Sequence, residues 1–220
     1  MTVILARKPI SLLIFDMDGV LVSTSACHAQ AYRELWNRLE LTGPDYPNIA
    51  GRKTSEVVQE ATAVLNPDES DVRKWVRFKQ NRARDLIEST DICFPDTLES
   101  LERLSAHDVK LALGTAASPE TAFYILDRYQ IRDHFSIVLT AKDVNRGKPA
   151  PDIYRAIVER QNIAPDMCLV VEDSYSGIEA AISAGLPVVS VRTRIESNNP
   201  AFLASYADLS ELLSTLQMAL

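Results

Sequence analysis

Residues 12–20 read LLIFDMDGV, four apolar residues that lead directly into two aspartates, Asp16 and Asp18. A short continuous apolar run is typical of a strand buried on both faces of a parallel sheet. In open parallel sheets, ligands bind beyond the carboxyl ends of the strands, so both aspartates stand where a functional site is expected. Carboxylates this close repel each other unless a cation or a shared proton relieves them. The alternative interpretation of these residues is a solvated Asp-Gly turn.

Beyond this stretch, short apolar runs alternate with longer helical patterns, which is typical of a parallel sheet covered by helices. We predict strands over residues 11–15, 109–114, 136–140, 168–172 and 188–191, and helices over residues 97–105, 119–129, 151–161, 176–184 and 208–218. Between the first two predicted strands only helical patterns occur, over residues 25–39, 54–64 and 68–87. The sequence therefore predicts an α/β protein. We expect a Rossmann-like parallel-sheet core, residues 1–22 and 92–220, with a small all-helical cap domain, residues 23–91, inserted after the first strand.

A second acidic pair, Glu172 and Asp173, ends another predicted strand. Parallel strands would place this pair at the same sheet edge as Asp16 and Asp18, and four carboxylates at one edge favour a hard cation. Magnesium is the usual choice where a few carboxylates, water and a substrate phosphate share the coordination shell. Lys148 lies in a loop before a predicted helix. Its compact positive charge, opposite the acids, is suited to balancing them and to binding phosphate.

A possible anion site lies at residues 114–118, where the second predicted strand meets its helix. The Thr115 hydroxyl and the free backbone N–H groups of a helix N-terminus are suited to an anion. Ser118 is instead expected to cap the helix.

Four stretches, residues 15–21, 111–118, 147–154 and 171–181, resemble the motifs of the haloacid dehalogenase superfamily of phosphoryl-transfer enzymes, in the family's order and spacing. The resemblance covers essentially the full chain, and the helical insert is similar to the cap of the phosphatase and β-phosphoglucomutase branch. It implies that Asp16 is the nucleophile, which forms an aspartyl-phosphate. It also implies that Asp18 is the general acid and base, which protonates the leaving alcohol and then activates water.

The same resemblance implies the ligands of the cation and of the phosphate. Mg²⁺ would be held by the Asp16 carboxylate, the Asp18 backbone carbonyl, and Glu172 and Asp173 directly or through water. The phosphoryl oxygens would be held by the Thr115 hydroxyl, the Ala116 N–H and Lys148. This division agrees with the charges, because phosphoryl transfer depends mainly on positioning and on neutralising the oxygens.

Substrate contacts are also expected from the cap, at His28, Gly51, Arg52, Lys53 and Lys79. Basic groups there favour a small phosphorylated metabolite such as a sugar or polyol phosphate, and closure of the cap would exclude water. For His28, a packed or solvated side chain is an equally good interpretation. The charged residues over 73–84, which include Lys79, are typical of a solvated helix face.

The favoured function is a magnesium-dependent phosphomonoester hydrolase, and a β-phosphoglucomutase-like sugar phosphomutase is the main alternative. Such mutases place an arginine three residues after the cap glycine, where this chain has Thr54, although Arg52 or Lys53 could replace it. Phosphonate hydrolysis is a minor alternative, because Lys53 is displaced by one position from the expected Schiff-base lysine. A non-catalytic phospho-ligand binder is another minor alternative, and it would have no need of an acid/base at Asp18.

Two departures from the family pattern lie outside the catalytic residues, and one of them is Ser23, at the hinge of the cap, where the family often has an acid. The family usually has Pro-Gly where this chain has Pro95-Asp96. We expect this difference to alter the detail of a turn and not to remove activity.

Composition narrows the class of protein further. The 220 residues contain 23 Lys and Arg against 30 Asp and Glu, a net charge of −7. This acidic balance argues against nucleic-acid or anionic-membrane partners, and no apolar run is long enough to span a membrane. The early acids after Arg7 and Lys8 argue against a secretory signal, and the three widely spaced cysteines suit a reducing compartment. We therefore expect a cytoplasmic enzyme, of an oligomeric state that the sequence leaves open.

Overall fold

A single sheet of six parallel strands forms the centre of the computed structural model, which describes residues 9–216. In sheet order the strands are β3 (Ile137–Leu139), β2 (Lys110–Gly114), β1 (Leu12–Phe15), β4 (Cys168–Glu172), β5 (Val188–Val191) and β6 (Phe202–Tyr206). In register, Leu12 of β1 lies opposite Lys110 of β2 on one side and Cys168 of β4 on the other. The carboxyl ends of these three strands therefore lie side by side at one edge of the sheet.

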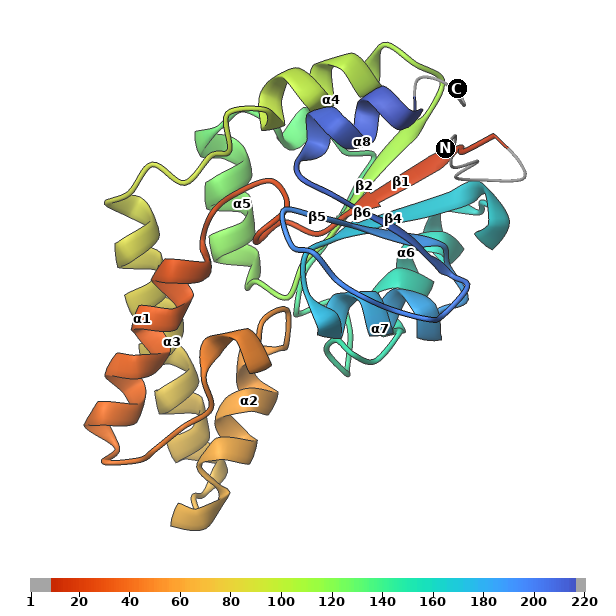
Figure 1. Cartoon of the computed structure of the whole chain (residues 1–220). Coiled ribbons are helices and arrows are strands. Elements are labelled where there is room, and N and C mark those ends of the chain that lie inside the picture. Colours follow the sequence, from red (N-terminus) through yellow and green to blue (C-terminus); the bar gives the residue numbers. More distant parts are fainter. Residues whose placement is uncertain (1–8, 217–220) are drawn as a thin grey trace.

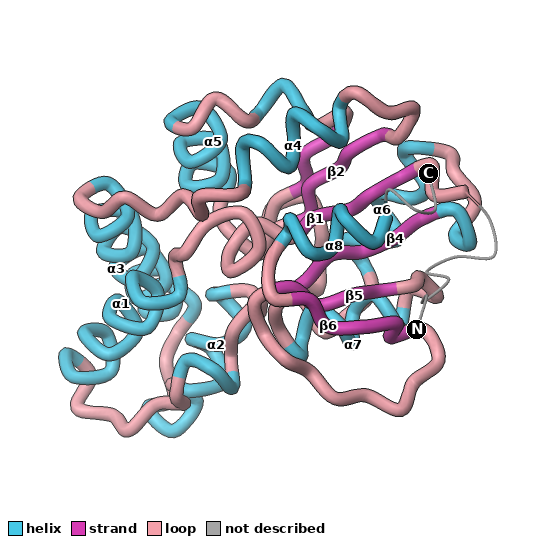
Figure 2. Tube along the Cα trace, turned by 45° about the horizontal axis from the view of Figure 1, so that its top comes forward, coloured by secondary structure: helices cyan, strands magenta, loops and turns pink. Residues whose placement is uncertain are grey.

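Helices cover both faces of the sheet (Figure 1; Figure 2). The first face carries α4 (Thr97–Ser105), α5 (Pro119–Arg128) and α8 (Leu209–Leu216), and the second carries α6 (Asp152–Gln161) and α7 (Tyr175–Ser183). Within β1, Leu13 and Phe15 point into the first apolar layer, and Leu12 and Ile14 point into the second. This alternation follows from the two-residue period of a strand. Each fully buried side chain of this size contributes about 1.5–3 kcal/mol, so β1 is anchored on both faces.

The segment between β1 and α4 folds as three helices that lie to one side of the sheet (Figure 1). They are α1 (Ser25–Arg38), α2 (Thr54–Ala61) and α3 (Glu69–Glu88). Buried apolar residues of α1, α2 and the segment between them form a separate cluster, Tyr32, Leu35, Trp36, Ile49, Val57 and Val58. Partly buried side chains of α3 pack against it. We call residues 23–91 the helical insert; its status as a separate domain remains a prediction.

The structure confirms the predicted α/β class and the parallel sheet, and β4 and β5 have the predicted bounds. The predicted helix over 54–64 is shorter, because α2 ends at Ala61 and a 3₁₀ turn (Ala63–Leu65) follows. Strand β6 was not predicted. It lies at the edge of the sheet and four of its five residues are only half-buried, so it lacks the continuous apolar run of the inner strands. Residues 217–218 of the last predicted helix lie outside the described residues.

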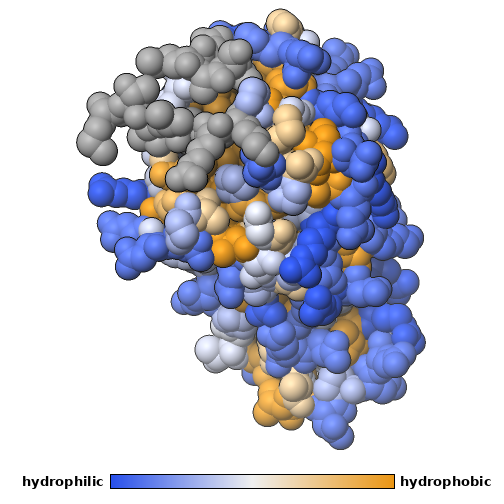
Figure 3. Space-filling model, turned by 90° about the vertical axis from the view of Figure 1, so that its right-hand side faces the viewer, coloured by the Kyte–Doolittle hydropathy of each residue, from blue (hydrophilic) through white to orange (hydrophobic). Residues whose placement is uncertain are grey.

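The outer surface is mainly polar on the face drawn in Figure 3. Charged and polar side chains cover most of the face seen in Figure 3, and apolar side chains there form small patches. Across residues 9–216, we find no helix with both the length and the apolar character needed to cross a membrane.

Candidate active site

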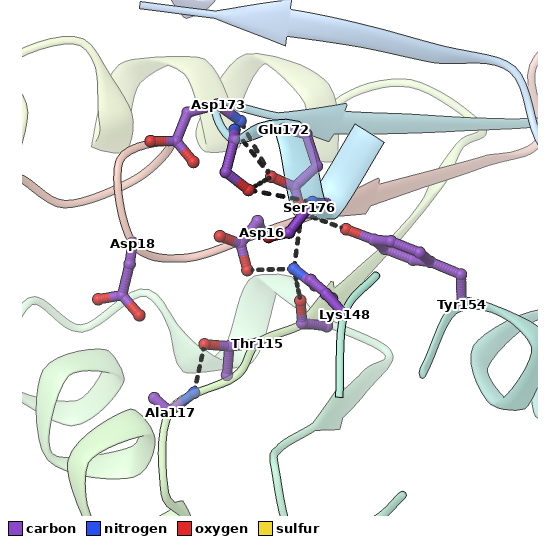
Figure 4. A network of polar contacts seen from close by, with 12 residues as sticks. Asp16, Asp18, Thr115, Ala117, Lys148, Tyr154, Glu172, Asp173 and Ser176 are labelled. Carbon is purple, nitrogen blue, oxygen red and sulfur yellow. Dashed lines mark hydrogen bonds and ion pairs between the residues drawn. The ribbon is translucent and has the colours of Figure 1, made fainter. Parts of the chain in front are cut away.

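A buried lysine joins two carboxylates at the carboxyl edge of the sheet (Figure 4). The Nζ of Lys148 lies 2.8 Å from Asp16 Oδ1 and 2.6 Å from Glu172 Oε1, and it donates a third hydrogen bond, of 3.1 Å, to the Gly114 carbonyl. Its side chain is 1% exposed. Burial opposes the charge, but the two carboxylates hold the pKa of Lys148 well above its usual value. All three N–H donors of the ammonium group are therefore in use.

The Glu172 carboxylate accepts hydrogen bonds on both oxygens. Its Oε1 accepts from Lys148 and, at 2.5 Å, from the Tyr154 hydroxyl. Its Oε2 accepts from the backbone N–H groups of Asp173 and Ser174 and from the Ser174 hydroxyl. Burial would raise the pKa of Glu172, but these donors lower it. A carboxylate held by five donors is better placed to orient Lys148 than to bind a metal directly.

Three carboxylates stand close enough to bind one metal ion. Ligand atoms of Asp16, Glu172 and Asp173 all lie within 4.8 Å of one another. Burial together with the neighbouring acids raises the pKa of Asp173 to about 9, and burial raises that of Asp16 to about 7 even beside Lys148. A divalent cation would relieve this repulsion, and oxygen donors of this kind suit Mg²⁺. Gly19, at φ +84°, leaves the space that Asp173 occupies, since a Cβ there would stand 1.8 Å from Asp173 Oδ2.

Asp18 belongs to a different network, which faces the helical insert. In Figure 4 no drawn interaction joins it to Asp16. Its Oδ1 accepts a 2.5 Å hydrogen bond from Thr24 and lies 3.6 Å from His28 Nε2. Burial would raise the pKa of Asp18, but these two neighbours lower it. On the other side of the imidazole ring, His28 Nδ1 lies 3.0 Å from the Nζ of Lys79.

Lys79 is buried inside the insert, contrary to the expected solvated face. Its residue is 3% exposed, and its Nζ lies 3.4 Å from Thr54 Oγ1 and 4.3 Å from the centre of the Tyr32 ring. Because burial dominates, the pKa of Lys79 falls to about 7. The sequence held the signal for this burial. Along α3, the inward-facing residues Val72, Val76, Ala83 and Ile87 recur at helical spacing, and Lys79 falls on the same stripe.

A pocket between the sheet edge and the insert unites the two networks. From the core it is lined by Asp16, Asp18, Ala116, Ala117, Ser118 and Thr121. From the insert it is lined by His28, Tyr32, Tyr46, Ile49, Gly51, Arg52, Thr54, Lys79, Gln80 and Ala83. Tyr32, Tyr46 and Gln80 were not among the expected site residues. They carry no motif, and their positions depend on how the insert packs against the core.

Two basic residues of the insert are engaged elsewhere. Arg52 reaches the pocket, but its Nη2 is paired with Glu60 at 2.6 Å. Lys53 turns away to the core loop, where its Nζ donates to the carbonyls of Val144 (3.0 Å) and Asn145 (3.3 Å).

Residues 115–118, in the loop after β2, have three different surroundings. Ala116 lines the pocket, whereas the Thr115 residue is fully buried and its hydroxyl accepts a 3.1 Å hydrogen bond from the Ala117 N–H. Ser118 caps α5 as expected, accepting from the Thr121 N–H. Because the Thr115 hydrogen remains available, its hydroxyl can still donate to an anion.

Comparison with known proteins agrees with this architecture. A family profile described as "Haloacid dehalogenase-like hydrolase" matches residues 13–191. The chain is 32% identical to the fructose-1-phosphate phosphatase YqaB of Escherichia coli, over 82% of this chain and 95% of that protein. It is 31% identical to a phosphorylated carbohydrates phosphatase of Thermotoga maritima, over 79% of this chain and 81% of that protein. Its fold matches a β-phosphoglucomutase structure from Clostridium difficile with a TM-score of 0.78 at 22% identity, covering 96% and 98% of the two chains.

The chain therefore belongs to the haloacid dehalogenase-like hydrolase family. Both of the relatives described above are named as phosphatases, which supports phosphatase activity for this chain. The likeness to the mutase structure extends to the fold alone.

Proposed function

We propose that this protein is a magnesium-dependent phosphomonoester hydrolase that acts on a sugar or polyol monophosphate through an aspartyl-phosphate. One observation carries the proposal: Asp16 and Asp18 line the same pocket but belong to separate networks. Lys148 donates a hydrogen bond to one oxygen of Asp16. Asp18 instead contacts Thr24 and His28. The contact with Lys148 and the place in the acidic cluster suit Asp16 to accept the phosphoryl group, and the separate partners of Asp18 leave it free to transfer a proton.

In the first step, an Asp16 carboxylate oxygen forms a bond to phosphorus and the bond from phosphorus to the ester oxygen breaks. Because Thr24 and His28 lower the pKa of Asp18 in the free protein, Asp18 takes up a proton from the incoming monoanionic ester. It then gives this proton to the departing alkoxide, which leaves as the alcohol. In the second step, Asp18 takes a proton from water as the water oxygen bonds to phosphorus. The bond between phosphorus and Asp16 then breaks and inorganic phosphate is released.

The remaining core residues bind and orient. Bound Mg²⁺, held by Asp16, Asp173 and the Asp18 carbonyl, would neutralise charge on the transferring group. Glu172, with its five donors, fixes Lys148 beside Asp16. The Thr115 hydroxyl and the Ala116 N–H are the proposed phosphate donors. A direct phosphate contact from Lys148 requires it to exchange one of its three present hydrogen bonds.

The character of the insert side of the pocket favours a phosphatase over a mutase. A mutase must grip a second phosphate, but Arg52 is paired with Glu60 and Lys53 with the core loop. Lys79 is buried, with a pKa lowered to about 7. Hydroxyl and amide groups of Tyr32, Tyr46 and Gln80 instead suit an uncharged polyhydroxylated end. The names of the phosphorylated-carbohydrate and fructose-1-phosphate phosphatases support the same substrate class.

The test is phosphate release across sugar, polyol, nucleotide and two-carbon phosphates, with and without Mg²⁺. We expect Mg²⁺-dependent turnover of sugar or polyol monophosphates, lost in Asp16→Asn and strongly reduced in Asp18→Asn. β-Glucose 1-phosphate is included and glucose 6-phosphate is followed as a product. Isomerised sugar phosphate with little free phosphate would establish the mutase instead, and no turnover of any ester would overturn the proposal.

A further inference from the structure

Two chain segments connect the helical insert to the core, and they are joined to each other. Leu21 in the first connection accepts hydrogen bonds on its carbonyl from the Phe94 N–H (3.3 Å) and the Thr97 hydroxyl (2.7 Å). The Ser23 N–H donates to the Ile92 carbonyl at 2.6 Å. These hydrogen bonds join residues 21–23 to residues 92–97 in a paired strip. Any movement of the insert relative to the sheet must bend this strip.

Arg192, the residue after β5, contacts both connections with one side chain. Its Nε donates to the Val20 carbonyl at 3.1 Å, and its Nη2 lies 2.6 Å from Asp96 Oδ1. The guanidinium also stacks over Phe94, 3.7 Å from the ring centre. The side chains of Arg192 and Asp96 are only 15% and 16% exposed. A pair this well enclosed is screened much less by solvent than a surface ion pair.

Asp96 extends the contact to a third element. Its Oδ2 accepts a 2.9 Å hydrogen bond from the N–H of Leu209, the first residue of α8. Both oxygens of this carboxylate are thus in use. The Asp96 carboxylate therefore joins the second connection both to Arg192 after β5 and to the start of α8.

The backbone of Arg192 gives an independent indication that its position is imposed. Its φ is +64°, in the left-handed region that residues with a Cβ rarely adopt. Its N–H donates to the Tyr206 carbonyl at 2.9 Å, which holds the residue against β6. Such a conformation persists only where the surrounding structure determines it, and it is frequent at functional positions.

We propose that Arg192 and Asp96 form a hinge clamp, a positioning pair that fixes the turn carrying Asp18 and the strip on which the insert moves. Val20, which the clamp holds, lies two residues after Asp18, and the intervening turn is closed by the Gly19 N–H to the Val22 carbonyl at 2.7 Å. Arg192 and Asp96 are not among the residues that line the pocket. They act through the placement of Asp18, so the effect on turnover rests on the proposed function.

The test compares Arg192→Gln, Asp96→Asn and the double variant with the wild type. We expect each single variant to lower kcat about tenfold with a smaller change in KM. The kcat of the double variant should equal that of the single variants, because each single substitution already breaks the same Arg192–Asp96 pair. Arg192→Lys keeps a charge for Asp96 and should recover part of the loss. Arg155→Gln is the matched control, since Arg155 also donates to a backbone carbonyl, that of Ser183 at 2.9 Å, far from both connections.

Amide hydrogen exchange supplies a readout that needs no substrate. Exchange in residues 20–23 and 92–94 should accelerate in the clamp variants but not in Arg155→Gln, while β1 and α5 keep wild-type protection. Unchanged exchange in these segments, or a kcat equal to that of the control, would overturn the clamp. If the wild type releases no phosphate from any ester, the proposed function fails, and the exchange data still decide whether the clamp exists.

Discussion

Lys148, beside Asp16 at the sheet edge, and Lys79, in the lining of the pocket, are both buried, yet their pKa values move in opposite directions. Lys148 has two carboxylates within hydrogen-bond distance, and their attraction outweighs the loss of water. Lys79 directly contacts an imidazole, a hydroxyl and an aromatic ring, none of which is an anion, and the Asp18 carboxylate beyond His28 offsets its burial only in part. Burial then favours the neutral amine. The difference lies in the partners, since both side chains are nearly inaccessible to solvent.

Lys79 should therefore make stability depend on pH. Its pKa is 10.5 in the unfolded chain and about 7 in the folded one, so the unfolded state binds more protons between these values. Burying Lys79 therefore lowers the unfolding free energy. This loss of stability is largest below pH 7 and becomes smaller as the pH rises toward 10.5. Lys79→Met removes it. We predict that the unfolding free energy of the variant minus that of wild type falls by roughly 1.4 kcal/mol per pH unit from pH 7 to about 10.

Urea unfolding at pH 7, 8 and 9, in constant Mg²⁺, measures this difference. Subtracting the wild type cancels other groups that titrate in the same range, such as Asp173. Lys74→Met, an exposed lysine on the same helix, controls for the loss of a positive charge. A Lys79→Met difference that is the same at pH 7 and pH 9 would contradict the prediction.

At the scale of elements, α2 and the loop before α6 hold the insert against the core. Glu56 Oε1 on α2 accepts a 2.7 Å hydrogen bond from the Gly147 N–H, next to Lys148. Lys53 donates to the same loop from the start of α2, and Arg52 pairs with Lys148 through the backbone. A Cβ at Gly147 would stand 2.5 Å from the Lys53 Cβ. Glycine is required there by this close approach.

Removing the Glu56 contact should loosen the insert side of the pocket without touching the catalytic groups. A hydrogen bond to a charged group contributes about 1.5–3 kcal/mol, and less where water can enter. We therefore predict that Glu56→Ala raises KM roughly fivefold, at about 1 kcal/mol, and changes kcat little. Steady-state kinetics measure both. Glu56→Gln, which keeps an acceptor oxygen, and Glu69→Ala, an exposed glutamate of α3, should behave like wild type. An unchanged KM in Glu56→Ala would show that this contact does not hold the pocket closed.

The sequence predicts the elements whose pattern is local and misses what depends on packing between elements. The buried strands β4 and β5 were predicted with their bounds because they are continuous apolar runs. Edge strand β6 was missed because its residues are half-buried and mixed. The acids and Lys148 were predicted to meet because parallel strands share a carboxyl edge. Tyr46 and Gln80 reach the pocket only through the docking of the insert, which no local pattern encodes.

On the scale of the whole molecule, an acidic protein has to accept an anionic substrate. The chain carries a net charge of −7, and three carboxylates lie close together at the carboxyl edge of the sheet. Lys148 neutralises part of this charge, but the pKa of Asp173 still rises to about 9 because of burial, Glu172 and Asp16. A bound divalent cation would supply the missing positive charge. Folding and cation binding should therefore be coupled, because the site exists only in the folded chain.

We predict that Mg²⁺ raises the melting temperature. A ligand at ten times its dissociation constant stabilises the folded state by about 1.4 kcal/mol, which is roughly 3–5 °C for a chain of this size. Thermal unfolding with MgCl₂, against KCl at equal ionic strength, measures the shift. Asp173→Asn should lose the shift and, without Mg²⁺, melt higher than wild type, because folding no longer carries the cost of protonating a buried carboxylate. Asp18→Asn should keep the shift, since its backbone carbonyl is unchanged. An equal Mg²⁺ shift in wild type and Asp173→Asn would place the cation elsewhere, and the carboxylates at the sheet edge would then need another counter-charge.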